Sequence, residues 1–292
     1  MLTIGDISKI GLGTGRLASL GDALPQEKCN ELIRKGLENG VNVLDTSDTY
    51  GSGDSERAIA KAIQGQRDSF FIITKAGFPH MNLPGWMSPL NQVGKKVVQK
   101  LGAKKKYTKS YLIKSLHKSL KRLKTEAVNA FVLHEPKYAE LADDTWEGLE
   151  AIRKSGMALY TGVSTYDYQV VTAGLESKQV QLIETPIFLL QDKKEQAIAE
   201  ICHKNDIPVV ANQVLFKLHR LKSAHQKELE QLFKKYNVEN ADLARVFIGY
   251  VASRQGVKNT LIGTKNIHHL IENARIATYD EQLYKDIQVL GL

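Results

Sequence analysis

The sequence predicts an α/β protein, namely a single-domain (β/α)8 (TIM) barrel over residues 1–292. Eight short apolar segments alternate with segments of helical periodicity along the whole chain, which is the pattern of parallel strands joined by helices. No linker rich in Pro, Gly or Ser divides the chain, so we expect one domain. Eight strand and helix units in 292 residues fit a closed barrel better than an open sheet of about six strands.

The predicted strands are short runs rich in β-branched or aromatic residues. They cover residues 10–15, 41–45, 70–75, 130–134, 158–163, 181–186, 207–212 and 259–263. A helix is predicted over 25–39, where apolar residues recur at helical spacing from Cys29 to Leu37, Pro25 suits a first turn and Gly40 ends the helix. Further helices are predicted around 58–63, from about 108 to 121, and over 146–155.

Three of the predicted strands end in polar residues of different kinds. Asp45 ends the second strand, Lys75 the third and His134 the fourth, and Tyr50 follows Asp45 closely. Taken singly, each has a structural explanation, such as a helix cap, a solvated strand end or a core histidine. In a parallel barrel, however, the C-terminal ends of the strands form the active site. Together the four residues predict one site of chemistry.

The motifs around these residues resemble the aldo-keto reductase family. They are GLGTG, DTSDTYGSGDSE, LKRLKTEAVNAFVLHEP, GVST and LIGTKNIHHLIEN, in the family's order and over nearly the whole chain. The resemblance implies an oxidoreductase that interconverts a carbonyl and an alcohol with a nicotinamide cofactor. It implies that the catalytic residues are Asp45, Tyr50, Lys75 and His134.

The chemistry of carbonyl reduction is consistent with those four side chains. A proton must reach the carbonyl oxygen, and a free Tyr hydroxyl with a pKa of about 10 is a poor acid at neutral pH. We expect Lys75 to lower the pKa of Tyr50, and Asp45 to pair with Lys75 and fix its charge. His134 would orient the substrate carbonyl. The hydride must come from the cofactor, because no side chain supplies one.

The resemblance also implies a cofactor site, from which the chain departs in part. Ser164 and Thr165 stand where a Ser and an Asn hold the nicotinamide carboxamide. Glu184 stands in place of a Gln that binds the same amide, and a carboxylate cannot donate to the amide oxygen. Ile187 stands in place of a Tyr that stacks on the nicotinamide ring. The implied cofactor residues are Gly13, Thr14, Ser164, Thr165, Glu184, Asn212, Gln213, Leu215, Gly263, Thr264, Lys265, His269, Glu272 and Asn273.

NADPH is favoured over NADH as the cofactor. Thr264 and Lys265 offer a hydroxyl donor and a cation to a 2′-phosphate. His269 stands where phosphate-preferring members carry an Arg, and neutral imidazole is a weaker anion partner than a guanidinium group.

A long loop is predicted at about 77–107, over the mouth of the barrel. Loops of this length without structure of their own tend to be lids or binding loops. We expect Phe78, His80 and Trp86 to contact the substrate. The alternative, that these rings fold onto their own scaffold, stays open.

The net charge of +8 is concentrated in one stretch. Between Lys95 and Lys124 there are twelve Lys and Arg residues and no Asp or Glu. A solvated helix face explains this pattern, and attraction of an anionic substrate or partner is the functional alternative. A nucleic-acid partner is not expected, because aromatic interleaving and a known binding module are lacking.

Other classes of site and location receive little support from the sequence. The segment at His134 lacks the second His of a zinc protease, so no metal is expected. No apolar run reaches about 18 residues and no signal segment is seen, so we expect no membrane association. Cys29 and Cys202 suit a reduced, cytoplasmic protein. The expected partner is a small polar carbonyl or alcohol substrate, sugar-like or anionic, and the oligomeric state is not predicted.

Two alternatives from other classes stay open. One is a nucleotide-binding regulatory module on the same barrel, which the changes at Glu184 and Ile187 favour. The other is a non-redox enzyme that returns the hydride internally. The four intact catalytic candidates favour chemistry over binding alone, but they do not separate net reduction from internal hydride return.

Overall fold

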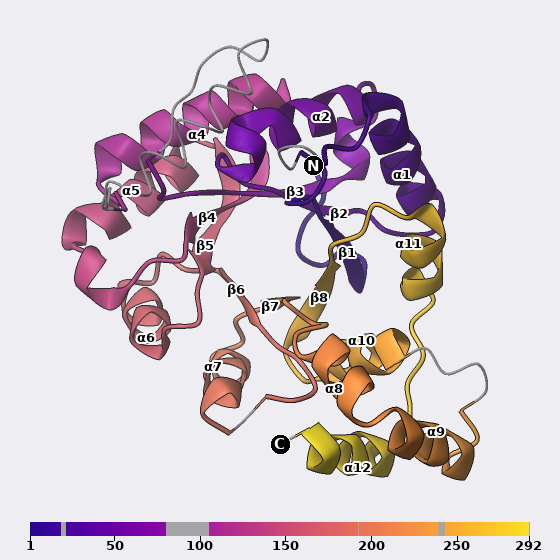
Figure 1. The fold of residues 1–292 in the computed structure, drawn as a ribbon. Helices are drawn as coiled ribbons and strands as arrows, with labels where there is room; N and C mark the ends of the chain where they lie inside the picture. Colours follow the sequence, from indigo (N-terminus) through magenta and orange to yellow (C-terminus); the bar gives the residue numbers. More distant parts are fainter. Residues whose placement is uncertain (19–21, 80–104, 192, 239–242, 292) are drawn as a thin grey trace.

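Eight parallel strands form a closed barrel in the computed structural model, and helices surround it (Figure 1). The strands follow one another around the barrel in chain order, and β1 pairs with β8. The predicted (β/α)8 barrel is therefore confirmed. The structure describes residues 1–18, 22–79, 105–191, 193–238 and 243–291.

Strands and helices alternate as far as β7, and α8, α9 and α10 all lie between β7 and β8. The strands are β1 (Ile10–Gly13), β2 (Val43–Asp45), β3 (Phe71–Ala76), β4 (Val128–His134), β5 (Ala158–Ser164), β6 (Leu182–Pro186), β7 (Val209–Asn212) and β8 (Val257–Ile262). The α-helices are α1 (Gln26–Glu38), α2 (Asp54–Ala62), α4 (Lys109–Leu123), α5 (Asp143–Lys154), α6 (Tyr168–Ser177), α7 (Lys193–Lys204), α8 (Leu218–Ala224), α9 (Gln226–Lys235), α10 (Leu243–Ser253), α11 (Ile267–Ala274) and α12 (Glu281–Gly291). The short 3-10 helices of the described residues are η1 (Tyr50–Gly53), η2 (Arg67–Ser69) and η4 (Tyr138–Glu140).

Side chains along each strand alternate between the barrel interior and the surrounding helices. Val43, Phe71 and Ile73 belong to a small buried cluster inside the barrel, whereas Leu44 and Ile72 pack in the larger cluster under the helices. Because strand side chains change face at every residue, a residue two positions beyond an interior one also faces inward. The interior cluster is thereby extended at its C-terminal end by a polar layer made of Asp45, Lys75, His134, Glu184 and Asn212.

The barrel closes where the two ends of the chain meet. β1 pairs with β8, and α1 lies beside α11 on the outside of this seam (Figure 1). Gly11 on β1 allows the close approach, because a Cβ there would lie 2.5 Å from the Asn259 side chain and 2.9 Å from that of Leu261.

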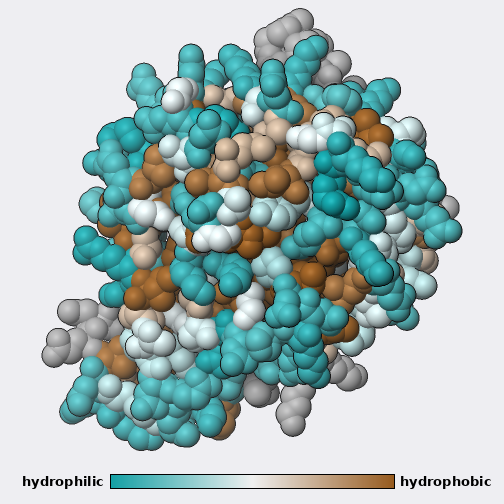
Figure 2. Space-filling view, turned by 180° about the vertical axis from the view of Figure 1, so that it is seen from behind, coloured by the Kyte–Doolittle hydropathy of each residue, from teal (hydrophilic) through white to brown (hydrophobic). Residues whose placement is uncertain are grey.

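The face of the molecule seen in Figure 2 is largely hydrophilic, with hydrophobic residues in patches between the polar ones. The described part of the basic stretch lies mainly on α4, which buries Leu112 and Leu116 and exposes Lys114 and Lys118. This is the arrangement of an amphipathic surface helix. Among the described residues, none of the helices combines the length and the apolar character that crossing a membrane requires.

The predicted loop at about 77–107 is described only at its two ends. The backbone N–H of Lys106 donates to the oxygen of Gly77 at 2.9 Å, and the Tyr107 hydroxyl donates to the backbone oxygen of His134 at 2.8 Å. Gly77 has a φ of 150°, and a side chain there would overlap the Tyr107 ring. The ends of the loop are therefore held together beside the C-terminal ends of β3 and β4.

Candidate active site

Lys75 is buried inside the barrel and is held by two groups of the β2 segment. Its ammonium group donates to the Asp45 carboxylate and, at 3.1 Å, to the backbone oxygen of Thr46. Lys75 is 0% exposed and Asp45 is 4% exposed. Alternation along β2 and β3 explains the contact, because both side chains extend the interior face of neighbouring strands.

Tyr50 begins η1 and lies above this pair. The Lys75 ammonium nitrogen is 5.4 Å from the centre of the Tyr50 ring. The turn that follows uses left-handed backbone at Gly51, Ser52 and Gly53, with φ values of 57°, 54° and 92°, which explains the glycines next to the Tyr. The Tyr50 hydroxyl makes no hydrogen bond with any described residue, so it is available to a bound molecule.

His134 ends β4 and faces Tyr50. The two rings are 5.8 Å apart between centres and nearly perpendicular. A hydrogen bond of 3.0 Å joins the Ser47 hydroxyl to His134 Nδ1. Sequence reasoning missed Ser47, although a hydroxyl between Asp45 and Tyr50 was a signal that it belongs to the same site.

Glu184 adds a second carboxylate to Lys75. Its Oε2 atom lies 3.2 Å from the Lys75 ammonium nitrogen, and its Oε1 atom accepts a hydrogen bond of 2.8 Å from Asn212 Nδ2. Glu184 is 2% exposed. Sequence reasoning missed this ion pair, whose signal was a carboxylate inside an apolar strand, since such a group needs a cation. We call Asp45, Lys75 and Glu184 the barrel cluster.

The barrel cluster changes the acidity of its members and of Tyr50. Burial and the Glu184 carboxylate raise the pKa of Asp45 to about 8, although Lys75 opposes the rise. Burial lowers the pKa of Lys75, but Asp45 and Glu184 raise it above its ordinary value, so Lys75 keeps its charge.

The expected lowering of the pKa of Tyr50 is not found. Lys75 does lower it, but burial and the carboxylates of Asp45 and Glu184 together raise the pKa of Tyr50 above its ordinary value. The main physical reason is burial of the Tyr50 hydroxyl, which disfavours the phenolate. The carboxylates of Asp45 and Glu184 add to this effect and offset the positive charge of Lys75, and the expectation included neither burial nor the second carboxylate.

The other predicted cofactor residues are first met at the ends of β1 and β5. Gly13 ends β1 opposite Asp45, and the hydroxyl of Thr14 donates to the backbone oxygen of Asp45 at 2.8 Å. The Ser164 hydroxyl makes no hydrogen bond with any described residue, whereas that of Thr165 accepts a backbone N–H of the next turn at 3.0 Å. Ser164 therefore presents a free hydroxyl beside Glu184, its neighbour in the sheet.

A second group lies at the end of β7. The Oδ1 atom of Asn212 is buried without a hydrogen-bond partner among the described residues. Gln213 is exposed and has a φ of 51°, and Leu215 packs against the core. Ile187, on the β6 side, is 4% exposed.

The third group joins β8 to α11. The Asn266 side chain caps α11 by accepting two backbone N–H groups. The Lys265 ammonium nitrogen lies 2.6 Å from the carboxylate of Asp22. Asn273 is buried, and the predicted residues at least partly exposed here are Gly263, Thr264, Lys265, His269 and Glu272.

Of the predicted substrate residues, only Phe78 lies among the described residues. Its ring is 5.0 Å from that of His134 between centres. His80 and Trp86 lie outside the described residues.

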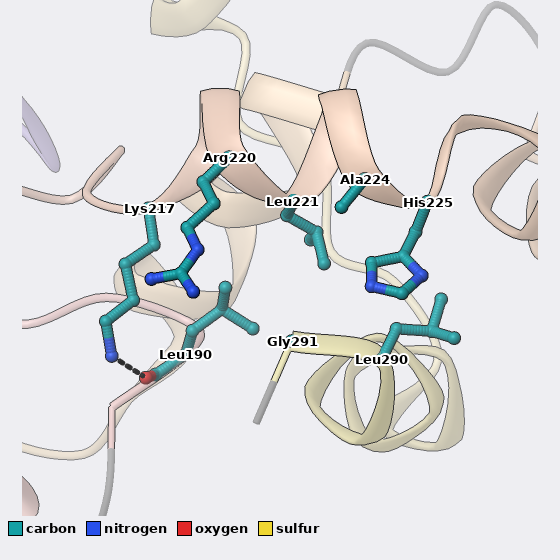
Figure 3. A pocket seen from close by; sticks show the side chains of 8 residues that line it. All are labelled: Leu190, Lys217, Arg220, Leu221, Ala224, His225, Leu290 and Gly291. Carbon is teal, nitrogen blue, oxygen red and sulfur yellow. Dashed lines mark hydrogen bonds between the residues drawn. The ribbon is translucent and has the colours of Figure 1, made fainter.

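A separate pocket of about 390 Å³ lies between α8 and α12 (Figure 3). None of the predicted site residues lines it. Its lining residues are Leu190, Lys217, Arg220, Leu221, Ala224, His225, Leu290 and Gly291. In the described parts of the chain, no three His, Cys, Asp or Glu side chains gather as metal ligands would.

Comparison with known proteins agrees with the barrel fold. A sequence model of the Aldo/keto reductase family matches residues 9–291. The chain is 25% identical to "Uncharacterized oxidoreductase YqkF" of Bacillus subtilis over 98% of this chain and 92% of that protein. It is 24% identical to "Methylglyoxal reductase YeaE" of Escherichia coli over 93% of this chain and 87% of that protein.

A solved structure has the same fold. It is the aldo-keto reductase from Klebsiella pneumoniae in complex with NADPH, which aligns with a TM-score of 0.77 and 20% identity over 98% of this chain and 91% of that one. The resemblance predicted from the motifs is confirmed by the family match over nearly the whole chain. The protein belongs to the aldo/keto reductase family.

Proposed function

We propose that this NAD(P)H-dependent oxidoreductase reduces the carbonyl group of a small polar substrate, sugar-like or anionic, with Tyr50 as the general acid. The observation that carries the proposal is the buried, charged Lys75 held 5.4 Å from the ring of Tyr50, whose hydroxyl has no hydrogen-bond partner among the described residues. A buried cation beside an ionisable side chain is typical of sites that move protons.

His134 orients the substrate in this proposal. Its ring faces that of Tyr50, and the 3.0 Å hydrogen bond between Nδ1 and the Ser47 hydroxyl fixes the orientation of the ring toward the substrate carbonyl. Tyr50 and His134 then both contact the oxygen atom of the substrate carbonyl. Tyr50 donates the proton to it, and His134 forms a hydrogen bond with it.

The residues at the ends of β5 and β7 fit a nicotinamide carboxamide, which offers an N–H donor group and one acceptor oxygen. Asn212 Oδ1 is a buried acceptor, and neither this atom nor the Ser164 hydroxyl has a hydrogen-bond partner among the described residues. Ser164 and Asn212 would hold the amide on either side of Glu184, the third residue predicted for it. The bound cofactor supplies the hydride.

NADPH is the cofactor that the β8–α11 segment favours. Lys265 is paired with Asp22, whose side chain is 84% exposed. A 2′-phosphate carries more charge than a carboxylate and would replace Asp22 on Lys265, with the Thr264 hydroxyl beside it. The proposed adenosine contacts also include Gly263, His269, Glu272 and Asn273.

An anionic substrate is supported by Lys105. Its ammonium group lies 4.4 Å from the centre of the Phe78 ring, which in turn packs on His134. Lys105 also donates to the backbone oxygen of Glu135. A cation beside Phe78, whose ring packs on His134, would attract an acidic or phosphorylated substrate.

The test is a titration with NADPH and NADH, followed by absorbance of the reduced cofactor during exposure to aldehydes, sugars and sugar acids. We expect tighter binding of NADPH and its consumption with at least one substrate class. Tyr50→Phe should lower turnover by about 10²–10⁴-fold without weakening NADPH binding. Tyr160→Phe is the matched control, because Tyr160 stacks on Phe71 elsewhere in the barrel.

The other outcomes separate the alternatives. Binding without consumption of cofactor, together with conversion of a substrate, would indicate internal hydride return. Binding without any conversion would indicate a regulatory module. Normal turnover by Tyr50→Phe would overturn the proposed role of Tyr50.

A further inference from the structure

The barrel cluster contains one carboxylate more than its cation balances. Asp45 and Glu184 both lie against Lys75, and all three side chains are at most 4% exposed. With every group ionised, the cluster would carry one uncompensated negative charge in the barrel interior. Burying an unbalanced charge costs several kcal/mol, whereas a neutral cluster avoids that cost.

The hydrogen bonds show where a proton is needed. Lys75 donates to Asp45 and to the backbone oxygen of Thr46, and Asn212 donates to Glu184 Oε1. Glu184 Oε2 lies 3.2 Å from the Lys75 nitrogen but receives no hydrogen bond from the described residues. A buried acceptor in that state is missing a donor. The charge of Glu184 also contributes to raising the pKa of Asp45.

We propose that Glu184 is a positioning residue of the proton relay, which shares both Lys75 and a single proton with Asp45 and thereby keeps Tyr50 in its proton-donating form. One carboxyl group carries the proton on an oxygen atom, and the other accepts it in a hydrogen bond. The cluster then has one positive and one negative charge. The proposal rests on the proposed role of Tyr50 as general acid.

The sharing gives the two directions of the reaction different pH dependences. Reduction needs the Tyr50 hydroxyl, whereas alcohol oxidation needs its phenolate to accept a proton. A Tyr50 phenolate that faces two carboxyl groups forms only at high pH. Its formation is disfavoured most after the shared proton has left Asp45 and Glu184, because both carboxyl groups are then negatively charged. Glu184 therefore restricts oxidation to more alkaline pH than a site with Asp45 alone. The charged and titratable groups that face Tyr50 are Lys75, Asp45, Glu184, Glu135 and His134.

Infrared spectroscopy tests the shared proton without cofactor or substrate. Wild-type protein at neutral pH should show the carbonyl stretch of a buried protonated carboxyl group, and this band should disappear as the pH rises. Glu184→Gln should lose the band, because Asp45 alone beside Lys75 is ionised. Glu56→Gln, which changes a buried carboxylate on the other face of β3, should retain it.

A second readout follows Tyr50. The phenolate absorbance of Tyr50 is obtained by subtracting the absorbance of the Tyr50→Phe variant from that of the protein with Tyr50 at each pH. Glu184→Gln should bring the ionisation of Tyr50, and the pH profile of alcohol oxidation, to lower pH by about one unit or more. Glu184→Asp, which keeps the charge, should keep the wild-type profile.

Absence of the band from wild type, or its survival in Glu184→Gln, would overturn the proposal. An unshifted Tyr50 titration would do the same. If Glu184→Gln does not fold, the proposal is tested by the wild-type infrared titration and by Glu184→Asp. The shared proton predicts the carboxyl band in the wild type and an unchanged Tyr50 titration in Glu184→Asp. Failure of the proposed function would instead appear as loss of cofactor consumption with the infrared band intact.

Discussion

Two buried ion clusters lie on opposite faces of β3, and their make-up differs. On the inner face, Lys75 belongs to the barrel cluster. On the outer face, the hydroxyl of Thr74 donates to Glu56 Oε1 at 2.7 Å, and Arg122 Nε donates to Glu56 Oε2 at 2.5 Å. We call Glu56 and Arg122 the outer pair.

The outer pair is balanced in charge, and both of its carboxylate oxygens have hydrogen-bond donors. One cation meets one carboxylate, both oxygens of Glu56 have donors, and Arg122 also donates to the Ser119 hydroxyl at 3.0 Å. The barrel cluster has an extra carboxylate and an oxygen without a donor. A balanced pair holds elements together, here α2 and α4 against β3, whereas an unbalanced cluster perturbs pKa values and suits proton transfer.

The largest expected effect comes from removing each cation. Lys75→Met should reduce turnover by about 10²–10⁴-fold, because Tyr50 then faces carboxyl groups without the cation. Arg122→Met should leave the turnover of the folded protein nearly unchanged. Steady-state rates normalised to folded protein measure both. Equal losses of turnover in Lys75→Met and Arg122→Met would contradict a catalytic role for the barrel cluster and a purely structural role for the outer pair.

The next effect concerns stability. Glu56→Ala leaves Arg122 without its partner in a site where Glu56 is 0% exposed, and should lower the free energy of unfolding by about 3–5 kcal/mol. Urea denaturation measures the change. A loss below about 1 kcal/mol, the range of exposed ion pairs, would contradict the assignment of the outer pair as a buried structural bridge.

The pH dependence of stability should separate the clusters as well. The pKa of Asp45 rises from an ordinary 3.8 to about 8 on folding, so its contribution to stability is complete below its ordinary pKa and is lost as the pH approaches 8. The slope for one proton is at most about 1.4 kcal/mol per pH unit. Between pH 3.8 and about 8, the free energy of unfolding of the wild type should fall more steeply with rising pH than that of Glu184→Gln. Parallel curves would show that Glu184 does not raise the pKa of Asp45.

The smallest expected effect compares two serines. Ser47→Ala removes a hydrogen bond to His134 and should lower kcat/KM by roughly 3- to 10-fold, in line with the usual contribution of one hydrogen bond. Ser119→Ala removes a hydrogen bond from Arg122 and should cost about 1 kcal/mol of stability with kcat/KM unchanged. A loss of kcat/KM in Ser119→Ala, with only a loss of stability in Ser47→Ala, would contradict the assignment of catalysis to the inner face of β3 and of structural support to its outer face.

The barrel and its four leading site residues could be predicted because each depends on local pattern. Strand segments show as apolar runs, and parallel strands bring their C-terminal residues to one end, so Asp45, Lys75 and His134 meet without any distant information. Family motifs added Tyr50 and the cofactor segments.

Contacts across the barrel could not be predicted in the same way. The meeting of Glu184 with Lys75 depends on which face of β6 points inward and on how wide the barrel is at that level. β4 likewise begins at Val128, two residues before the predicted start, because polar Asn129 interrupts the apolar run. Its side chain accepts the N–H of Ile72 at 2.9 Å and donates to the oxygen of Leu2 at 2.8 Å.

The contacts of Gly77 with Lys106 and Tyr107 hold the two ends of the predicted loop together, so the segment between them can be replaced as a unit. The chain leaves and re-enters the barrel at almost one point, where a backbone hydrogen bond of 2.9 Å joins the two ends. The entropy of closing a loop grows slowly with its length, by about 0.6 kcal/mol for each doubling. Segments of other lengths and compositions can therefore be grafted there at little cost to the barrel. Lys75, two residues before Gly77, would keep its contacts with Asp45 and Thr46 when the segment is replaced.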